Sequence, residues 1–180
     1  YKPNVLKSYG PIFSQEKIGE YSAKIANICN IVKKSTGIVL IYSQYIDGGI
    51  LPLALALEEL GLSRYSSTPN FNKSLFKKKQ REPIDSKTMK TKEEMEKERN
   101  AETKEKNTEI SEFNPAKYIM ITGDKSISPS NANDIKYATN VENRNGENVR
   151  VILISKAGSE GLDFKNIRQI HILEPWYNMN

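Results

Sequence analysis

"GIVLIYSQYIDGGILPLALALEELG" occupies residues 37–61 and joins two contrasting patterns. Its first part, 38–42, is an uninterrupted β-branched and aromatic run, typical of a strand buried on both faces of a parallel sheet. Its last part, 50–61, is mainly apolar, with Pro52 in the first turn and Gly61 at the end, which predicts a helix. The residues between them, 43–49, predict a loop. A buried strand followed by a helix is the repeating unit of α/β folds.

The flanking sequence continues this alternation. Five apolar side chains recur every three or four residues and predict one amphipathic helix over 18–32: Ile18, Tyr21, Ile25, Ile28 and Val32. Further along, the sequence predicts a strand over 118–121, a helix from the Ser130 cap to about 141, and strands over 149–154 and 167–173. We therefore expect an α/β fold of three layers, with helices on both faces of a mostly parallel central sheet.

Residues 72–112 differ from the rest of the chain, because they are mostly Lys, Glu, Thr, Ser and Asn. Such a segment cannot bury enough apolar surface to offset its ordering entropy. We interpret it as a charged, low-complexity, disordered surface insertion, within which 90–106 has the composition of a solvated helix. The predicted organisation is a lead-in over 1–15, a first part of the domain over 16–71, the insertion, and a second part over 113–180.

The composition limits the setting and the partners. A net charge of +5 and a pI near 9.1 permit a nucleic-acid partner without demanding one. The single cysteine, Cys29, excludes an internal disulfide and a zinc cluster, and it favours a reducing, intracellular compartment. No apolar stretch approaches the about 20 residues that span a bilayer, so we expect no membrane association.

Each central strand is followed by a short polar turn. In parallel sheets these turns lie at the same edge, where ligands bind. Backbone amides and short hydroxyls reach phosphate oxygens without reading bases. An acid can accept hydrogen bonds from ribose hydroxyls, and glycines allow close approach. The residues are Ser43, Thr122 and Ser155 with Lys156 beside it, then Gly158, Gly161 and Asp163. Taken singly, each also fits an ordinary loop that bonds its own turn.

Catalytic machinery is not visible in the sequence. The only histidine, His171, alternates with Ile170 and Ile172, which places it opposite an apolar face or in the core. No cluster has metal-ligand spacing, and no G-x-x-x-x-G-K-[ST] loop is present. We therefore assign no catalytic and no metal-binding residue within this chain.

Three stretches carry a resemblance to a known family. "GIVLIYSQYIDGGILPLALALEELG", "YIMITGD" and "VRVILISKAGSEGLDFKNIRQIHILEPWYN" resemble the second, C-terminal RecA-like domain of superfamily 2 helicases. The resemblance is strongest to helicases of large DNA viruses, relatives of the poxvirus early transcription factor and nucleoside triphosphatase helicases, and more distant to Swi/Snf-type translocases. It covers 21–180 except the insertion.

The resemblance implies roles for the strand-end turns. The turns that begin at Ser43, Thr122 and Ser155 would contact the backbone of DNA or RNA, and the end of the last loop would face ATP. The implied nucleic-acid residues are Ser43, Gln44, Thr122, Gly123, Ser155 and Lys156, and the implied ATP residues are Gly161 and Asp163. Lys156 departs from the family pattern, because many relatives have an acid or a neutral residue at this position.

The resemblance also implies partners. ATP and Mg²⁺ would be bound mainly by a preceding RecA-like domain that carries the P-loop, and an arginine finger would follow soon after residue 180. We then expect the chain alone to be an inactive fragment of an ATP-dependent helicase or translocase. Its partners would be nucleic acid, that preceding domain and transcription machinery, in viral transcription or DNA metabolism, within the host cytoplasm or the virion.

Two other function classes stay open at this point. One is a RecA-like module that binds nucleic acid or acts as a scaffold in a transcription complex without hydrolysing nucleotide. The other is an α/β sugar-nucleotide transferase domain, whose strand-end loops also hold nucleotides. A P-loop upstream and a Q-x-x-G-R-x-x-R pattern downstream would favour the motor, and their absence would favour the scaffold.

Overall fold

The fold is centred on a sheet of five strands. A computed structural model of the chain describes residues 1–78, 81–102, 112–158 and 162–175. All strand pairs in this sheet are parallel, and the order is β2-β3-β4-β1-β5. The strands are β1 (Ile38–Ser43), β2 (Ser63–Arg64), β3 (Lys117–Ile121), β4 (Val151–Ser155) and β5 (Ile167–Ile172). The predicted α/β fold with a RecA-like parallel sheet is confirmed.

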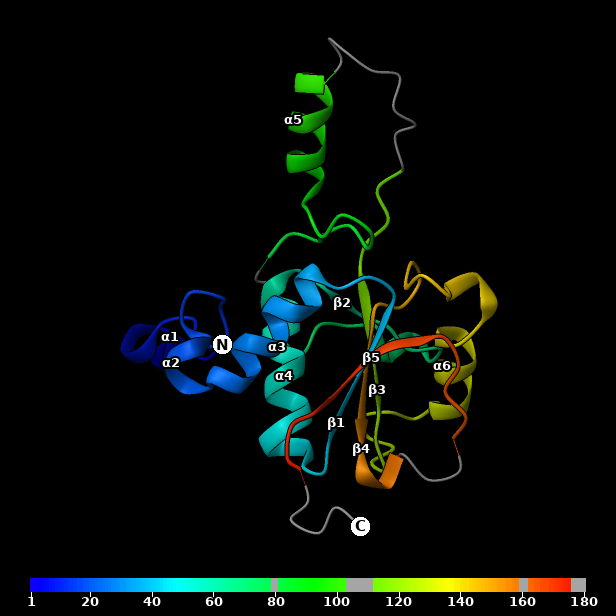
Figure 1. The fold of residues 1–180 in the computed structure, drawn as a ribbon. Helices are drawn as coiled ribbons and strands as arrows, with labels where there is room; N and C mark the ends of the chain where they lie inside the picture. The colour runs from blue at the N-terminus through cyan, green and yellow to red at the C-terminus, as the bar shows by residue number, and fades with distance from the viewer. Residues whose placement is uncertain (79–80, 103–111, 159–161, 176–180) are drawn as a thin grey trace.

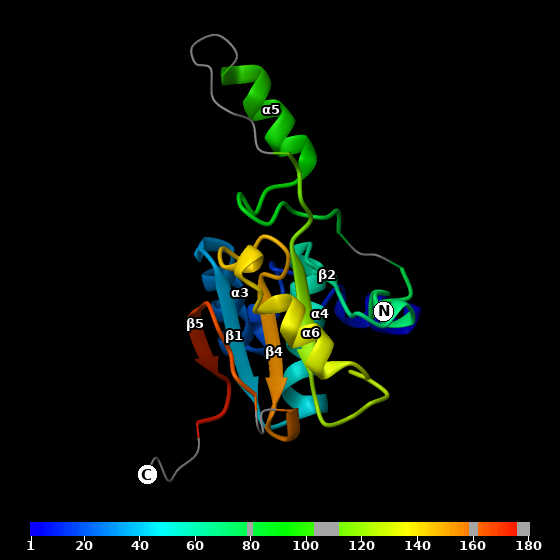
Figure 2. The same cartoon turned by 90° about the vertical axis from the view of Figure 1, so that its right-hand side faces the viewer.

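Helices cover both faces of the sheet (Figures 1 and 2). On one face, α3 (Ala23–Lys34) and α4 (Leu51–Leu60) share a buried cluster with Val39 and Ile41 of β1. On the other, α6 (Asn131–Ala138) shares a second cluster with Ile38 and Leu40. The other helical segments are α1 (Pro3–Tyr9), α2 (Ile18–Tyr21), α5 (Lys92–Glu102), η1 (Ile46–Ile50), η2 (Pro69–Phe71), η3 (Val141–Asn143) and η4 (Lys156–Gly158). Across the described residues, no helix is long and apolar enough to cross a membrane.

The single helix predicted over 18–32 is wrong, because the chain forms two helices that meet at Ser22. Ser22 has an extended backbone with φ −154° and ψ 98°, and its hydroxyl accepts a hydrogen bond from the Ile25 amide at 3.2 Å. It therefore caps the start of α3. The break changes the helical phase, so Tyr21 is 52% exposed whereas the later residues of the pattern are buried.

The polar stretch after β1 is also more regular than the predicted loop. It contains the π-helical turn η1, which runs directly into α4. At the other end of α4 the prediction is confirmed. Gly61 has φ 108°, in the left-handed region, and its amide donates to the carbonyl groups of Leu57 and Glu58.

Side chains of the last strand, β5, alternate as predicted, but the isoleucines are the exposed ones and the histidine is the more buried one. Ile170 is 63% and Ile172 is 56% exposed, whereas His171 is half-buried. The two isoleucines pair with Leu40 and Tyr42 of β1 and so lie on the face that carries α6. That helix packs against β3, on the far side of β4 and β1. The isoleucine side of β5 therefore has no covering helix within the described residues.

The described part of the 72–112 segment is anchored to the core. Phe76, Ile84 and Met89 are buried, and the last two belong to the cluster under α3 and α4. Beyond them, α5 lies within the stretch predicted as a solvated helix, and it projects from the amino ends of the strands (Figure 2). Residues 103–111 lie outside the described residues, and the domain boundaries stay predictions.

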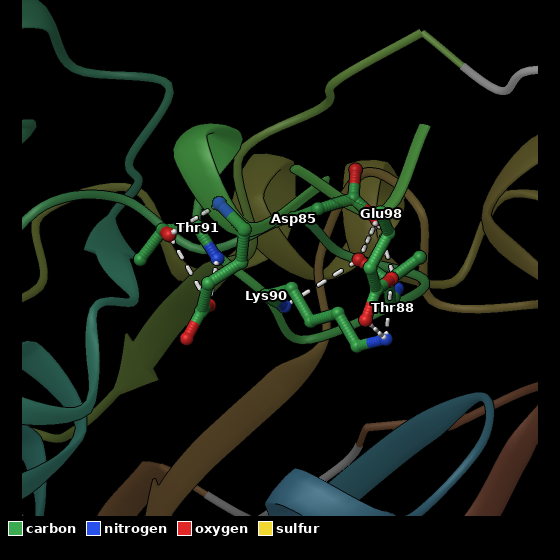
Figure 3. A network of polar contacts seen from close by, with 6 residues as sticks. Asp85, Thr88, Lys90, Thr91 and Glu98 are labelled. Atoms are coloured by element: carbon green, nitrogen blue, oxygen red, sulfur yellow. Dashed lines mark hydrogen bonds and ion pairs between the residues drawn. The ribbon is translucent and has the colours of Figure 1, made fainter. Parts of the chain in front are cut away.

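Polar contacts fix the base of α5 (Figure 3). The Thr91 amide donates to the Glu94 carboxylate at 2.7 Å, and the Glu94 amide donates to the Thr91 hydroxyl at 3.2 Å, which is a reciprocal capping box. Below it, Asp85 is buried, and its carboxylate accepts the Asn114 amide at 2.9 Å. Burial opposes ionisation of Asp85, but hydrogen bonds from this and neighbouring amides lower its pKa.

A buried carboxylate joins the same segment to the sheet. Glu58 of α4 accepts the Tyr118 hydroxyl at 2.8 Å and the Leu75 amide at 3.0 Å, and it also accepts the Ser74 hydroxyl. Tyr118 is fully buried in β3. Burial first, then the negative charge of Glu58 and the hydrogen bond to it, raise the pKa of Tyr118 well above its ordinary value.

This raised pKa predicts a loss of stability in alkali. Because the folded-state pKa of Tyr118 lies above the unfolded one, its contribution is complete below about pH 10 and is lost as the pH rises toward the folded-state pKa. We expect Tyr118→Phe to remove up to about 1.4 kcal/mol per pH unit of that loss. Urea unfolding across this range measures it, with Tyr9→Phe, an exposed ring, as the control. The same pH slope in Tyr118→Phe and the unmodified chain would contradict the assignment.

Candidate nucleic-acid and nucleotide interface

The turns after β1, β3 and β4 meet at one edge of the sheet, as predicted. Ser43 and Ser155 are register partners at the ends of neighbouring strands. A Cβ added at Gly123 would lie 2.6 Å from the Ala157 Cβ, so the turns after β3 and β4 touch. A Cβ at Gly158 would lie 2.3 Å from the Ile121 carbonyl oxygen. Gly158 therefore allows the close backbone approach that the sequence predicted.

A fourth turn, after β2, lies at the same edge and was missed by sequence reasoning. The Ser66 hydroxyl and the Ser67 amide donate to the buried Asp134 carboxylate at 2.9 and 2.6 Å. The Thr68 and Ser130 hydroxyl oxygens are 2.7 Å apart. These contacts join the turn to the start of α6. The run Ser-Ser-Thr-Pro-Asn over 66–70 was the available signal, but β2 has only two residues and gives no strand pattern.

The hydroxyl groups after the three main strands point inward. Ser43, Thr122 and Ser155 are at most 2% exposed. The Ser43 hydroxyl bonds within its own turn, to the Tyr45 carbonyl at 3.0 Å, and the Thr122 hydroxyl oxygen lies 2.7 Å from that of Ser128. The Ser155 hydroxyl has no hydrogen-bond partner among the described residues. These three residues are therefore buried inside the edge and offer no hydroxyl to solvent.

The exposed surface of the edge comes from their neighbours. Gly123 and Lys156 are exposed and Gln44 is half-buried. A cavity of about 430 Å³ lies at the start of α6, and its lining includes Thr122, Gly123, Lys125, Ser130, Asn131 and Ala157. The positive end of the helix dipole and the Lys125 ammonium group favour an anion there.

Acids are also present at this edge. Asp47 and Asp124 are exposed. Hydrogen bonds from the side chain and the backbone of Ser126 lower the pKa of Asp124. Lys125 and Lys156 are therefore interspersed with negative charge, and the edge is a mixed surface. Such a surface favours few and salt-sensitive phosphate contacts over tight binding.

The predicted nucleotide residue lies at the other end of α6. The Asp163 side chain is 80% exposed, with its carboxylate 3.6 Å from the Lys165 ammonium nitrogen. Both residues line a second hollow of about 430 Å³ with Lys136, Thr139 and Asn140 of α6 and its C-terminal turn. The ion pair is too exposed to fix the carboxylate, so Asp163 is free to accept a ligand hydroxyl. Gly161, the other predicted ATP residue, lies outside the described residues.

A metal site is not found among the described residues, which contain no group of three or more His, Cys, Asp or Glu side chains able to hold an ion. The cavity and the hollow both border Ala132, so α6 connects the two regions. Chemically, the arrangement offers an anion-binding edge at the start of α6 and a separate hydroxyl acceptor near its C-terminal end.

Comparison with known proteins gives relatives from large DNA viruses. The chain is 31% identical over 160 residues to a termination factor NPH-I homolog of African swine fever virus, which covers 87% of this chain and 21% of the relative. It is 25% identical over 181 residues to a protein named as an ATP-dependent RNA helicase in Acanthamoeba polyphaga mimivirus, covering 97% and 24%. It is 49% identical over 45 residues to nucleoside triphosphatase I of Choristoneura fumiferana entomopoxvirus, covering 24% and 7%.

The first two relatives match over nearly the whole chain. The chain spans about a fifth of the length of the African swine fever virus relative. No protein-family model matches the chain, and no solved structure gives a significant match. The resemblance to the superfamily 2 helicase group of large DNA viruses is confirmed by these relatives, and the chain is a homologue of one segment of such proteins.

Proposed function

We propose that this homologue of the viral superfamily 2 helicases is the C-terminal motor domain of an ATP-dependent nucleic-acid helicase or translocase. In this proposal the domain supplies part of the nucleic-acid groove and half of the ATP site. The observation that carries it is the convergence of four polar turns on one edge of a parallel sheet, with α5 at the opposite edge (Figure 2). Parallel sheets bind ligands at that edge.

The turns would act through their backbones. Gly123 and Lys156 are exposed at the edge, where an amide and an ammonium group can each meet a phosphate oxygen. The buried hydroxyls of Ser43 and Thr122 would hold their turns in shape through hydrogen bonds. Asp163 would accept a ribose hydroxyl of ATP. We propose that Mg²⁺ and the triphosphate are held by a preceding domain, because this chain has no P-loop sequence.

The names of the relatives support a biological setting for this proposal. The termination factor homolog supports a role in viral transcription, with transcription machinery as a further partner, and the relative named as an RNA helicase supports a nucleic-acid substrate. Backbone contacts fit either DNA or RNA. The neighbouring RecA-like domain of the same protein would be the partner that completes the ATP site.

Salt-dependent binding of a labelled single strand tests the proposal. With about three phosphate contacts, the affinity should fall about 20-fold between 50 and 200 mM salt, since each contact adds about −0.7 to the slope. Lys156→Ala should weaken binding and reduce that slope. Lys92→Ala, which removes the same charge from α5 at the opposite edge, is the matched control.

The results distinguish a specific interface, binding by net charge alone, and a non-hydrolysing scaffold. Weaker binding by Lys156→Ala with no change for Lys92→Ala supports the interface. If both variants lose the same affinity, binding depends only on the net charge of the chain, and the edge is not a specific interface. Binding by a complete protein that shows no nucleotide hydrolysis would favour the non-hydrolysing scaffold.

A further inference from the structure

An acidic side chain that follows β5 reaches the turn that follows β1. The Glu174 carboxylate accepts the Ser43 hydroxyl at 2.9 Å and the Gln44 amide at 3.2 Å, both through Oε2. These residues are 131 and 130 positions apart in the chain. They meet because β5 is the sheet neighbour of β1, and the Leu173 amide extends their ladder by donating to the Tyr42 carbonyl at 2.9 Å.

One side of this partly buried carboxylate packs against η1. A Cβ added at Gly49 would lie 1.9 Å from the Ser43 hydroxyl oxygen and 3.3 Å from Oε1 of Glu174. Ser43 is fully buried, and Gly49 is buried as well. The Glu174 carboxylate is therefore held between η1 and the turn after β1 by close contacts and hydrogen bonds.

Through the hydrogen bond from the Gln44 amide, the Glu174 carboxylate fixes the backbone of the turn. The Ser43 hydroxyl has a single proton, which the Tyr45 carbonyl can also accept at 3.0 Å. The Gln44 amide has no second acceptor among the described residues: its one hydrogen bond is to Glu174. A charged acceptor makes this a strong hydrogen bond, and its loss would free the amide and let the turn open.

We propose that Glu174 is a positioning residue of the interface: it sets the conformation of the Ser43–Gln44 turn and links that turn to the chain that leaves β5 (Figure 1). The inference rests on the proposed function of this turn in nucleic-acid binding.

Three variants test the proposal. Glu174→Gln and Glu174→Ala remove the same charge, but only Gln keeps an oxygen that can accept the Gln44 amide. Any difference between them therefore reports the hydrogen bonds and not the electrostatics. Asp47→Asn removes a negative charge from the exposed part of η1 and is the control for the charge effect. Each protein is assayed for amide hydrogen exchange at Gln44 and for binding of a labelled single strand at fixed salt.

We expect Gln44 exchange to be fast in Glu174→Ala and slow in Glu174→Gln. Binding by Glu174→Ala should be about tenfold weaker than by Glu174→Gln, which corresponds to about 1.4 kcal/mol. Asp47→Asn should bind no more weakly than the unmodified chain, because it removes only a repulsive charge.

Equal exchange and equal binding by the Gln and Ala variants would overturn the proposal, and so would fast Gln44 exchange in the unmodified chain. If Glu174→Ala does not fold, the comparison of Glu174→Gln with Glu174→Asp, whose shorter side chain withdraws the carboxylate, replaces it with the same expected order. Absence of nucleic-acid binding by the unmodified chain contradicts the proposed function alone, since the exchange comparison still decides whether Glu174 holds the turn.

Discussion

The isolated 180-residue chain is expected to hydrolyse ATP no faster than buffer, with or without nucleic acid. Its sequence has no P-loop, and the described residues offer no metal-binding cluster. In the complete protein that we propose, the missing groups include an arginine finger, which contributes about 10³–10⁵ in rate. The complete protein should therefore exceed the isolated chain by at least about 10³-fold in phosphate release.

Phosphate release from the isolated chain and from the complete protein, measured at equal concentration, decides this. The control is the complete protein with Asp163→Asn, which keeps the P-loop and should retain part of its activity. Robust turnover by the isolated chain would contradict the assignment as one half of a two-domain motor. If the complete protein is inactive but still binds a single strand, the result favours a non-hydrolysing scaffold over a motor.

The second large effect is expected from Gly158→Ala. An added Cβ would lie 2.3 Å from the Ile121 carbonyl oxygen and 3.1 Å from the Thr122 Cα, both backbone atoms that cannot rotate away. The turns after β3 and β4 must separate to admit the methyl group. We expect the free energy of unfolding to fall by about 1–3 kcal/mol, as for other overpacked sites.

Gly48→Ala provides the control, since its Cβ would meet only the Tyr45 Cβ, at 3.9 Å. Urea unfolding of both variants measures the difference. If Gly158→Ala is as stable as Gly48→Ala, the close approach of the two turns is not what the glycine provides. A stable Gly158→Ala protein with weakened strand binding would instead place the methyl group in the path of the ligand.

Strand patterns were the most predictable part of the fold. The runs over 38–42 and 118–121 contain apolar residues on both faces, which only a doubly covered parallel sheet accommodates, and both are confirmed. The convergence of the polar turns followed from that topology alone. Sequence reasoning could place the turns together because parallel strands end at the same edge.

Side-chain direction was less predictable, because it depends on tertiary partners. Ile170 and Ile172 alternate as a buried strand face would, yet both are exposed because α6 packs against β3. The Ser43 hydroxyl was expected to face a phosphate. It lies inside the turn, bonded to Glu174, a residue whose proximity no local pattern indicates. Ser22 likewise looked like a helical position until its capping bond to the Ile25 amide was visible.

Amide hydrogen exchange across the whole chain, with and without a bound single strand, shows which edge of the sheet binds nucleic acid. We expect protection of the turn amides over 43–45, 122–125 and 155–158, and no change over 92–100 of α5 at the opposite edge. Protection confined to α5 and the amino ends of the strands would contradict it, because the nucleic acid would then bind the wrong edge of the sheet.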